Sequence, residues 1–193
     1  MACLKYFVPV IFISLLTLSG CHGGSIKATN PDELPAIAPF RLTSPAFKNG
    51  DTIPSLYTCD SINISPTLHW NNPFKNTESF ALIMDDPDAS LTTWVHWIVY
   101  NIPASDTSLT THFPMDSTLV NGIKQGYTSF RTTGYGGPCP PDGIHRYYFK
   151  LYALDIKLEA PARLTKSQLL TVMKGHILAE ADLMGKYKKK KNT

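Results

Sequence analysis

Short apolar and alternating runs, separated by turn-forming residues, dominate the chain from about residue 40 onward. Pro, Gly, Asn and Asp split these runs, of which the clearest cover 40–42, 67–70, 79–85, 93–101 and 146–155. A two-residue period broken by such residues is typical of β-strands. Alternate positions on both faces are largely apolar in 94–100, which predicts an inner strand covered on both faces. The pattern therefore predicts a mostly β domain.

Helical signals occur only near the C-terminus. Thr165 and Gln168 have the spacing of a capping box ahead of an apolar run, which predicts a short helix there. A second short helix is predicted over 176–184, with Gly185 as its C-terminal stop. The expected architecture is a β domain with short C-terminal helices.

The first twenty residues have the pattern of an export signal. Lys5 precedes the apolar run 7–18, which is too short to span a bilayer comfortably, and the run ends in Leu-Ser-Gly before Cys21. This ending resembles the lipobox of bacterial lipoproteins, so 1–20 is predicted to be a lipoprotein signal peptide and Cys21 the lipidated residue. An ordinary secretory signal with an accidental cysteine is the alternative.

The segment that follows carries Gly, Asn and Pro with little apolar periodicity, so 21–39 is predicted to be a flexible tether to a domain at 40–187. Acyl chains on Cys21 would hold the protein on a membrane. His22 is not Asp, and by resemblance to Gram-negative lipoproteins this favours the outer membrane, facing the periplasm.

Two cysteines remain for the domain, Cys59 and Cys139. Export to an oxidising compartment makes a disulfide between them the expected state, and closing such a loop stabilises a fold by roughly 4 kcal/mol. Free thiols or metal ligands are the alternatives. Neither cysteine has a neighbouring Cys or His at ligand spacing, so no metal site is predicted.

Positive charge is concentrated at the C-terminus. The net charge is +3, but five lysines lie among the last eight residues, and without these and Lys5 the chain has 12 basic against 15 acidic residues. A slightly acidic body argues against a nucleic-acid surface. The basic tail, 188–193, is expected to be solvated, although lysines of this kind also bind anionic lipid or peptidoglycan.

Three distant segments, 85–89, 94–97 and 136–147, concentrate polar residues among Pro and Gly. Period-two alternation places Trp94 with His96 on one strand face, and His145 with Tyr147 on another. If these faces meet, two imidazoles and a phenol converge, and backbone N–H groups at 136–137 can approach an oxyanion.

The strings D-P-D-A, W-x-H-W and G-P-x-P-P-x-G-x-H-R-Y resemble, in this order, the phosphatidylethanolamine-binding protein family, in its bacterial Raf-kinase-inhibitor-like (YbhB/YbcL-type) branch. The resemblance covers about 40–187. It implies a β-sandwich around a large central sheet, with small helices at its end. The ligand pocket that it implies consists of Asp86, His96, Gly137, His145 and Tyr147, with Trp94 and Pro138 as walls.

Asp86 would repel an anion unless it accepts a hydrogen bond from a histidine N–H and so holds the other ring nitrogen toward the ligand. Binding the ammonium of an ethanolamine headgroup is its alternative role. The chain departs from the family at Ser90, where proline is common, and at 129–131, where Arg131 would add a cation near the mouth.

The leading functional hypothesis is a protein without a cofactor that binds a small anionic, phosphate-type ligand or a phospholipid headgroup. No nucleophile stands in an activating motif, so no catalytic residue is predicted. By analogy with eukaryotic relatives, the alternative is an inhibitor of a protease or kinase that docks its protein partner through the pocket region. A weaker alternative is a metal-independent phosphoester hydrolase in which His96 or His145 is the general base.

Overall fold

The computed structural model of the protein describes residues 38–190. The predicted signal peptide, the lipidation site Cys21 and almost all of the tether lie outside these residues. The secondary-structure elements of the described part, in chain order, are β1 (Leu42–Thr43), the 3-10 helix η1 (Ser55–Tyr57), β2 (Leu68–Trp70), β3 (Ser79–Asp86), β4 (Trp94–Pro103), β5 (Ser108–Leu109), β6 (Lys124–Gln125), β7 (His145–Leu154), α1 (Lys166–Met173) and β8 (Ile177–Tyr187).

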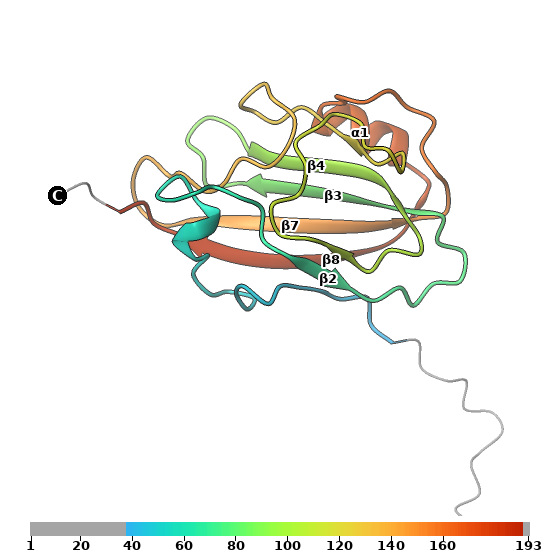
Figure 1. Cartoon of the computed structure of the whole chain (residues 1–193), viewed down its shortest axis with the longest axis horizontal. Coiled ribbons are helices and arrows are strands. Elements are labelled where there is room, and N and C mark those ends of the chain that lie inside the picture. The colour runs from blue at the N-terminus through green and yellow to red at the C-terminus, as the bar shows by residue number, and fades with distance from the viewer. Residues whose placement is uncertain (1–37, 191–193) are drawn as a thin grey trace, which may run out of the picture. The chain divides into compact units, whose positions relative to one another are not determined.

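The strands form two antiparallel sheets. The larger has the order β6-β4-β3-β7-β8 and the smaller the order β1-β2-β5. In Figure 1 the long strands of the larger sheet run side by side, with the end of β8 at the left, where the C-terminus leaves the domain. The predicted mostly β fold is confirmed, and β4 lies inside the larger sheet as predicted.

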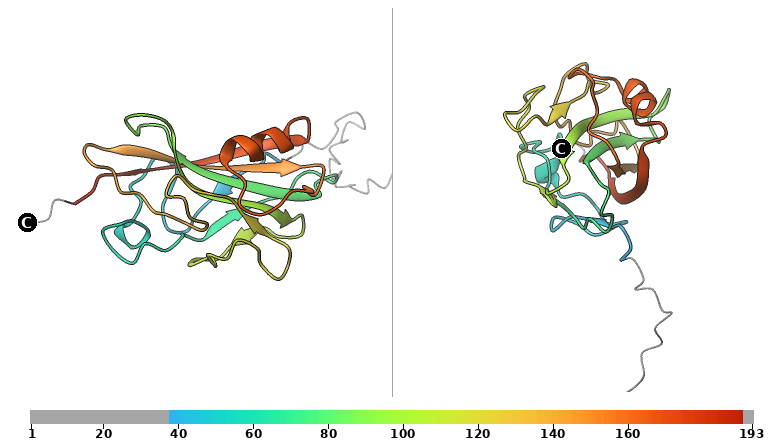
Figure 2. Two further views of the ribbon diagram at one scale, coloured as in Figure 1. Left: turned by 90° about the horizontal axis from the view of Figure 1, so that it is seen from above. Right: turned by 90° about the vertical axis from the view of Figure 1, so that its right-hand side faces the viewer.

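The larger sheet is covered on both faces, which explains why β3 is buried throughout and apolar from Phe80 to Met84. One face packs against the smaller sheet and its loops, through residues such as Leu68, Phe80 and Phe149. The other packs against α1 and the segment before it, through residues such as Ile83 and Leu169. The left panel of Figure 2 shows α1 on one side of the long strands and the N-terminal segments on the other.

The predicted helix over 176–184 is wrong, because this segment belongs to β8. The strand pairs antiparallel with β7 from His145↔Tyr187 to Leu154↔Ile177. The local sequence contains good helix formers, but the ladder with β7 overrides that preference. Gly185 is therefore not a helix stop: a Cβ on it would lie 2.4 Å from Cγ1 of buried Ile53, so this strand position requires the absence of a side chain.

The predicted capping box and disulfide are both present. Gln168 donates its backbone N–H to the Thr165 side chain at the start of α1, and its own side chain accepts from the backbone N–H of Thr165. Cys59 and Cys139 are disulfide-bonded with their Cα atoms 5.4 Å apart. Within 38–190, no helix has the length and apolar content needed to cross a bilayer.

Candidate functional site: a histidine cavity at one end of the larger sheet

A cavity of about 390 Å³ opens where β3 ends and where β4 and β7 begin. The register sets this meeting point, because Asp86 pairs with Trp94 and Asp85 with Tyr148. These are the strand ends at the left of Figure 1. Four predicted site residues from three separate segments line the cavity: Asp86, His96, His145 and Tyr147. Ser90 and Thr92 are the other polar side chains of its lining.

Asp86 holds the His145 ring. Nδ1 of His145 lies 2.7 Å from Oδ2 of Asp86, and both side chains are buried. The other carboxylate oxygen, Oδ1, accepts the backbone N–H of Asp88 at 2.8 Å. A carboxylate accepts a hydrogen on Nδ1, so Nε2 is the nitrogen that His145 has left for a ligand. This is the orienting arrangement expected for Asp86, and with both of its oxygens engaged it is poorly placed to bind an ammonium group.

His96 reaches the cavity through a β-bulge. Going from Met84 to Asp85 along β3, the partner on β4 changes from Trp97 to Val95, so His96 is the extra residue. Bulges commonly redirect a side chain next to a functional site. The His96 ring lies 5.1 Å from the Tyr147 ring, centroid to centroid.

The tautomer of His96 follows from its hydrogen bond. Nδ1 lies 2.6 Å from the carbonyl oxygen of Gly136, which only accepts, so Nδ1 carries the hydrogen and Nε2 is free. Burial lowers the pKa of His96 below its ordinary value, and its bond to the Gly136 carbonyl only partly opposes this effect. The ring is therefore neutral at pH 7, and its Nε2 accepts a hydrogen bond from a protonated ligand atom.

Tyr147 lies between the two histidines. Its ring is 5.1 Å from that of His96 and 6.5 Å from that of His145. The hydroxyl is buried and has no hydrogen-bond partner within the described residues. Burial, followed by the Asp86 charge, raises the pKa of Tyr147 above its ordinary value. The hydroxyl thus stays protonated and is a donor without an acceptor on the cavity floor.

The cavity walls are mostly apolar. Trp94 and Phe130 meet edge-to-face with ring centroids 5.4 Å apart, and Phe130 packs in the same way on His96. Cys139, Pro140 and Pro141 form another part of the wall, and residues 89–92, including Ser90, complete the lining. Trp94 is a wall, as the resemblance implied. Sequence reasoning missed Phe130 as a wall residue. The prolines that line the cavity are Pro140 and Pro141, and the expected Pro138 is not among the lining residues.

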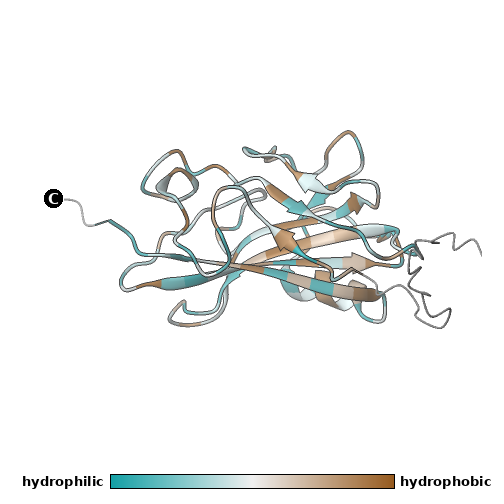
Figure 3. Cartoon of the chain, turned by 90° about the horizontal axis from the view of Figure 1, so that it is seen from below, coloured by the Kyte–Doolittle hydropathy of each residue, from teal (hydrophilic) through white to brown (hydrophobic). Residues whose placement is uncertain are grey.

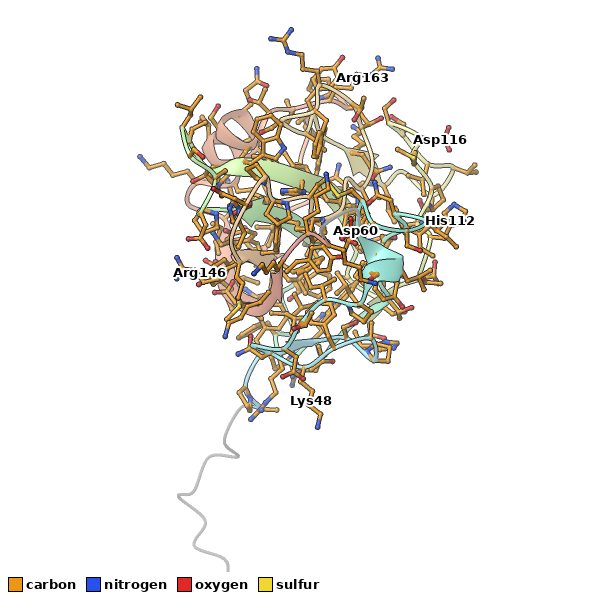
Figure 4. The ribbon with its side chains drawn as sticks, turned by 90° about the vertical axis from the view of Figure 1, so that its left-hand side faces the viewer. Lys48, Asp60, His112, Asp116, Arg146 and Arg163 are labelled. Carbon is orange, nitrogen blue, oxygen red and sulfur yellow. A yellow bond between two sulfur atoms is a disulfide. The ribbon has the colours of Figure 1, made fainter. Side chains whose placement is uncertain are left out.

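A surface ion pair fixes the loop after β3. Arg146 binds both carboxylate oxygens of Asp88, at 2.9 and 2.6 Å, and holds the pKa of Asp88 at about 2. Arg146 also donates its backbone N–H to the same carboxylate at 2.9 Å. Figure 4 looks onto this end of the molecule and labels Arg146. The pair ties the loop after β3 to the start of β7, beside His145.

The expected backbone donors for an oxyanion are already used inside the protein. The Gly136 N–H donates to the carbonyl of His96 at 2.9 Å, and the Gly137 N–H donates to Oδ1 of Asn63 at 2.8 Å. Gly137 is not among the residues that line the cavity. A Cβ on Gly137 would lie 2.3 Å from the Tyr57 carbonyl oxygen, so the glycine permits close packing of two loops.

Residues 38–190 contain no cluster of three or more His, Cys, Asp or Glu side chains suited to a metal ion. Arg131, the predicted departure from the family, is exposed and has φ of 62°, a left-handed conformation that glycine adopts most easily. The site is thus formed by two imidazoles, a phenol and a carboxylate below apolar walls.

A two-sheet β fold with an open, largely apolar hollow and a few convergent polar groups is consistent with a protein that binds a small ligand. Residues 43–188 match the family described as phosphatidylethanolamine-binding protein, and the chain belongs to this family. A relative from Methanothermobacter thermautotrophicus is 47% identical over 150 residues, which are 78% of this chain and 99% of the relative. That relative consists of little more than the domain described above.

Solved structures agree with this assignment. A phosphatidylethanolamine-binding protein homologue from Chlamydia trachomatis is 40% identical, with a TM-score of 0.73, over 78% of this chain and 98% of its own. YbcL of Escherichia coli is 33% identical, also with a TM-score of 0.73, over 79% of this chain and all of its own. These matches confirm the predicted fold and place the chain with the YbcL-type branch.

Proposed function

We propose that the cavity binds a phosphate-type anion, either free or as a phospholipid headgroup. The observation that carries this proposal is the unpartnered, protonated hydroxyl of Tyr147, buried between two histidines whose Nδ1 atoms are both engaged. A buried donor without an acceptor is costly in the free protein, and a ligand oxygen removes that cost. In this proposal a phosphate oxygen accepts from Tyr147, whose ring lies 5.1 Å from that of His96 and 6.5 Å from that of His145, centroid to centroid.

His96 distinguishes a phosphate that carries a proton, such as inorganic phosphate or a monoester, from the phosphodiester of an intact phospholipid, which binds through Tyr147 and His145 and has no proton for His96. His96 is held neutral by burial, so its Nε2 accepts a hydrogen bond and suits a phosphate that keeps one proton. The remainder of such a ligand would lie between the aromatic wall of Trp94 and Phe130 and the proline wall. The site therefore suits a phosphate attached to an organic group.

Calorimetry tests this proposal with the domain 38–193, inorganic phosphate, phosphoethanolamine and ethanolamine as probes. We expect phosphate and phosphoethanolamine to bind and ethanolamine not to bind, because Asp86 is already occupied. Tighter binding of phosphoethanolamine than of phosphate would show that an organic group attached to the phosphate adds affinity. Binding of ethanolamine alone, or of no probe, contradicts the proposal.

The control exploits a second histidine–aspartate pair. His176 lies 2.9 Å from Asp155 on the surface, outside the cavity. We expect His145→Ala to weaken phosphate binding roughly tenfold to a hundredfold, the range for a hydrogen bond to a charged group. His176→Ala should leave the affinity unchanged. Equal losses in the two variants would mean that the phosphate does not bind in the cavity.

The proposal includes export and anchoring through lipidated Cys21. It is supported by the signal-like residues 1–20, by the lipobox-like ending, and by a disulfide of the kind found in oxidising compartments. Radiolabelled palmitate in a producing bacterium should label the full chain and should not label Cys21→Ser. Recovery of an unlabelled, unprocessed wild-type chain from the cytosol would refute this part of the proposal. Fractionation of the two membranes then tests the expected outer-membrane location.

A further inference from the structure

The cavity end of the domain carries exposed apolar side chains that its core does not use. Leu91 is 99% exposed and Ile144 63%, while Phe130 and Trp94 are 44% and 36% exposed. Three of them line the cavity, and Ile144 directly precedes His145. We call these four residues the apolar rim. An apolar patch around a binding cavity marks a surface that meets another molecule or a membrane.

The C-terminal lysines leave the domain at the same end. Tyr187, the last residue of β8, pairs with His145 of the cavity floor, so 188–190 continue directly from the site. Figure 3 shows the chain becoming hydrophilic as it approaches this terminus. Lys188, Lys189 and Lys190 are exposed, and the sequence continues with Lys191.

Asp60 holds this lysine tail beside the cavity wall. Its Oδ2 accepts the Lys190 backbone N–H at 2.8 Å and the Tyr187 hydroxyl at 2.5 Å. Asp60 follows Cys59, whose disulfide partner Cys139 belongs to the cavity wall. Asp60, labelled in Figure 4, therefore holds the backbone of the tail near the mouth and leaves the lysine side chains exposed.

Most carboxylates at this end are already neutralised by partners. Asp86 is held by His145, and Asp88 by Arg146. Lys186, Arg131 and the three tail lysines are exposed and take part in no ion pair of the described part of the chain. The exposed carboxylates near them without such a pair include Asp51, whose backbone carbonyl accepts the Lys186 N–H, and Asp142. The surface around the mouth thus combines apolar side chains with an excess of free cations.

We propose that the cavity end docks on an anionic membrane surface, with the apolar rim inserted among the lipids and the lysine tail bound to their headgroups. Apolar insertion combined with basic contacts is the combination that holds peripheral proteins on anionic bilayers. The mouth of the cavity then faces the bilayer. This docking goes beyond the proposed ligand binding and does not require an occupied cavity.

The test uses the domain 38–193, which corresponds to relatives that consist of little more than this domain. Vesicles contain phosphatidylcholine with one third phosphatidylglycerol, or phosphatidylcholine alone. The readouts are co-sedimentation and tryptophan emission. Trp70 and Trp97 are buried, so a blue shift on docking reports Trp94. We expect binding and a blue shift with the anionic vesicles alone, both reduced by salt.

Two matched pairs of variants distinguish vesicle binding through this surface from effects of net charge and of non-specific hydrophobic adsorption. Replacing the three tail lysines by Ala should weaken binding roughly a hundredfold, because each lysine at an anionic surface contributes about a fivefold factor. The control removes the same charge through three exposed lysines beyond the other ends of the long strands: Lys75, Lys157 and Lys174. It should weaken binding by less than about threefold, the residual effect of distant charge at low salt.

For the apolar rim, Leu91→Ser with Ile144→Ser should weaken binding roughly tenfold through lost apolar burial. The control is Val120→Ser with Ile177→Ser, two exposed residues that do not line the cavity, and it should bind as the wild type does. Equal losses within either matched pair, or binding without a blue shift, overturn the proposal. Dimerisation that is lost in the rim variant, without vesicle binding, would instead make this surface an interface between copies. Phosphate calorimetry is independent of all these outcomes.

Discussion

Replacing Tyr147 by Phe should make the protein more stable and its cavity a weaker binder. The change removes one oxygen atom from a side chain whose exposed fraction is zero. That oxygen has no hydrogen-bond partner within the described residues, so the variant breaks no internal bond. It removes an unpaired buried donor from the free protein, and it also removes the donor assigned to the ligand.

The two effects have different magnitudes. A hydroxyl buried without a partner costs about 1–3 kcal/mol, and the adjoining cavity favours the lower end, so we expect a gain of about 1 kcal/mol. A hydrogen bond to a charged ligand contributes about 1.5–3 kcal/mol, which corresponds to a loss of roughly tenfold to a hundredfold in phosphate affinity. Urea unfolding gives the first quantity and calorimetry the second.

Tyr135→Phe is the matched control. The Tyr135 hydroxyl donates to the Tyr57 carbonyl at 2.7 Å and is also buried, so its removal leaves an unsatisfied carbonyl. We expect this variant to lose about 1 kcal/mol of stability and to keep its phosphate affinity. Should Tyr147→Phe prove as destabilising as Tyr135→Phe, the Tyr147 hydroxyl must make an internal bond, and its assignment to the ligand is refuted.

Three further predictions concern the fold. Replacing Cys59 and Cys139 together by Ala should cost about 4 kcal/mol on the loop-closure model, seen in urea unfolding, and the reduced wild type should match the variant. Gly185→Ala should cost about 1–3 kcal/mol by overpacking, and Ile53→Ala should recover part of that loss in a double-mutant cycle. Because burial lowers the pKa of His96, the unfolded state takes up a proton first, and stability should fall below about pH 6.5 by up to about 1.4 kcal/mol per pH unit. The difference in urea unfolding between wild type and His96→Gln measures this dependence, and parallel pH curves would contradict it.

Much of the fold could be predicted from local pattern and resemblance together. The runs that predicted strands at 79–85, 93–101 and 146–155 correspond to β3, β4 and β7, because strands packed on both faces must be apolar. Three strings of the family pattern then implied the convergence of His96, His145 and Asp86. Local periodicity alone could not, because it says nothing of which strand ends meet.

The parts that failed depend on partners distant in the sequence. The residues of β8 resemble a helix when read alone, and only the ladder with β7 makes them a strand. The N–H of Gly137 looked free because its acceptor, Asn63, lies 74 residues earlier. The bulge at His96 is a property of the pairing of β3 with β4, so strict alternation along β4 could not predict it. Neighbouring residues of a regular strand point to opposite faces, but this bulge places both His96 and Trp97 on the face of the sheet that carries Tyr147.

The floor and the rim of the cavity are built from different kinds of structure, and this separates their roles. His96, His145 and Tyr147 stand on long strands of the larger sheet and are buried. Both histidine rings are also held by hydrogen bonds, so the groups proposed to contact the anion are held rigidly. Leu91 and Phe130 stand on loops, which tolerate substitution far better than paired strands do. Changes at these two loop positions should therefore alter which organic group accompanies the proposed phosphate ligand, and which surface the domain meets, without removing phosphate binding.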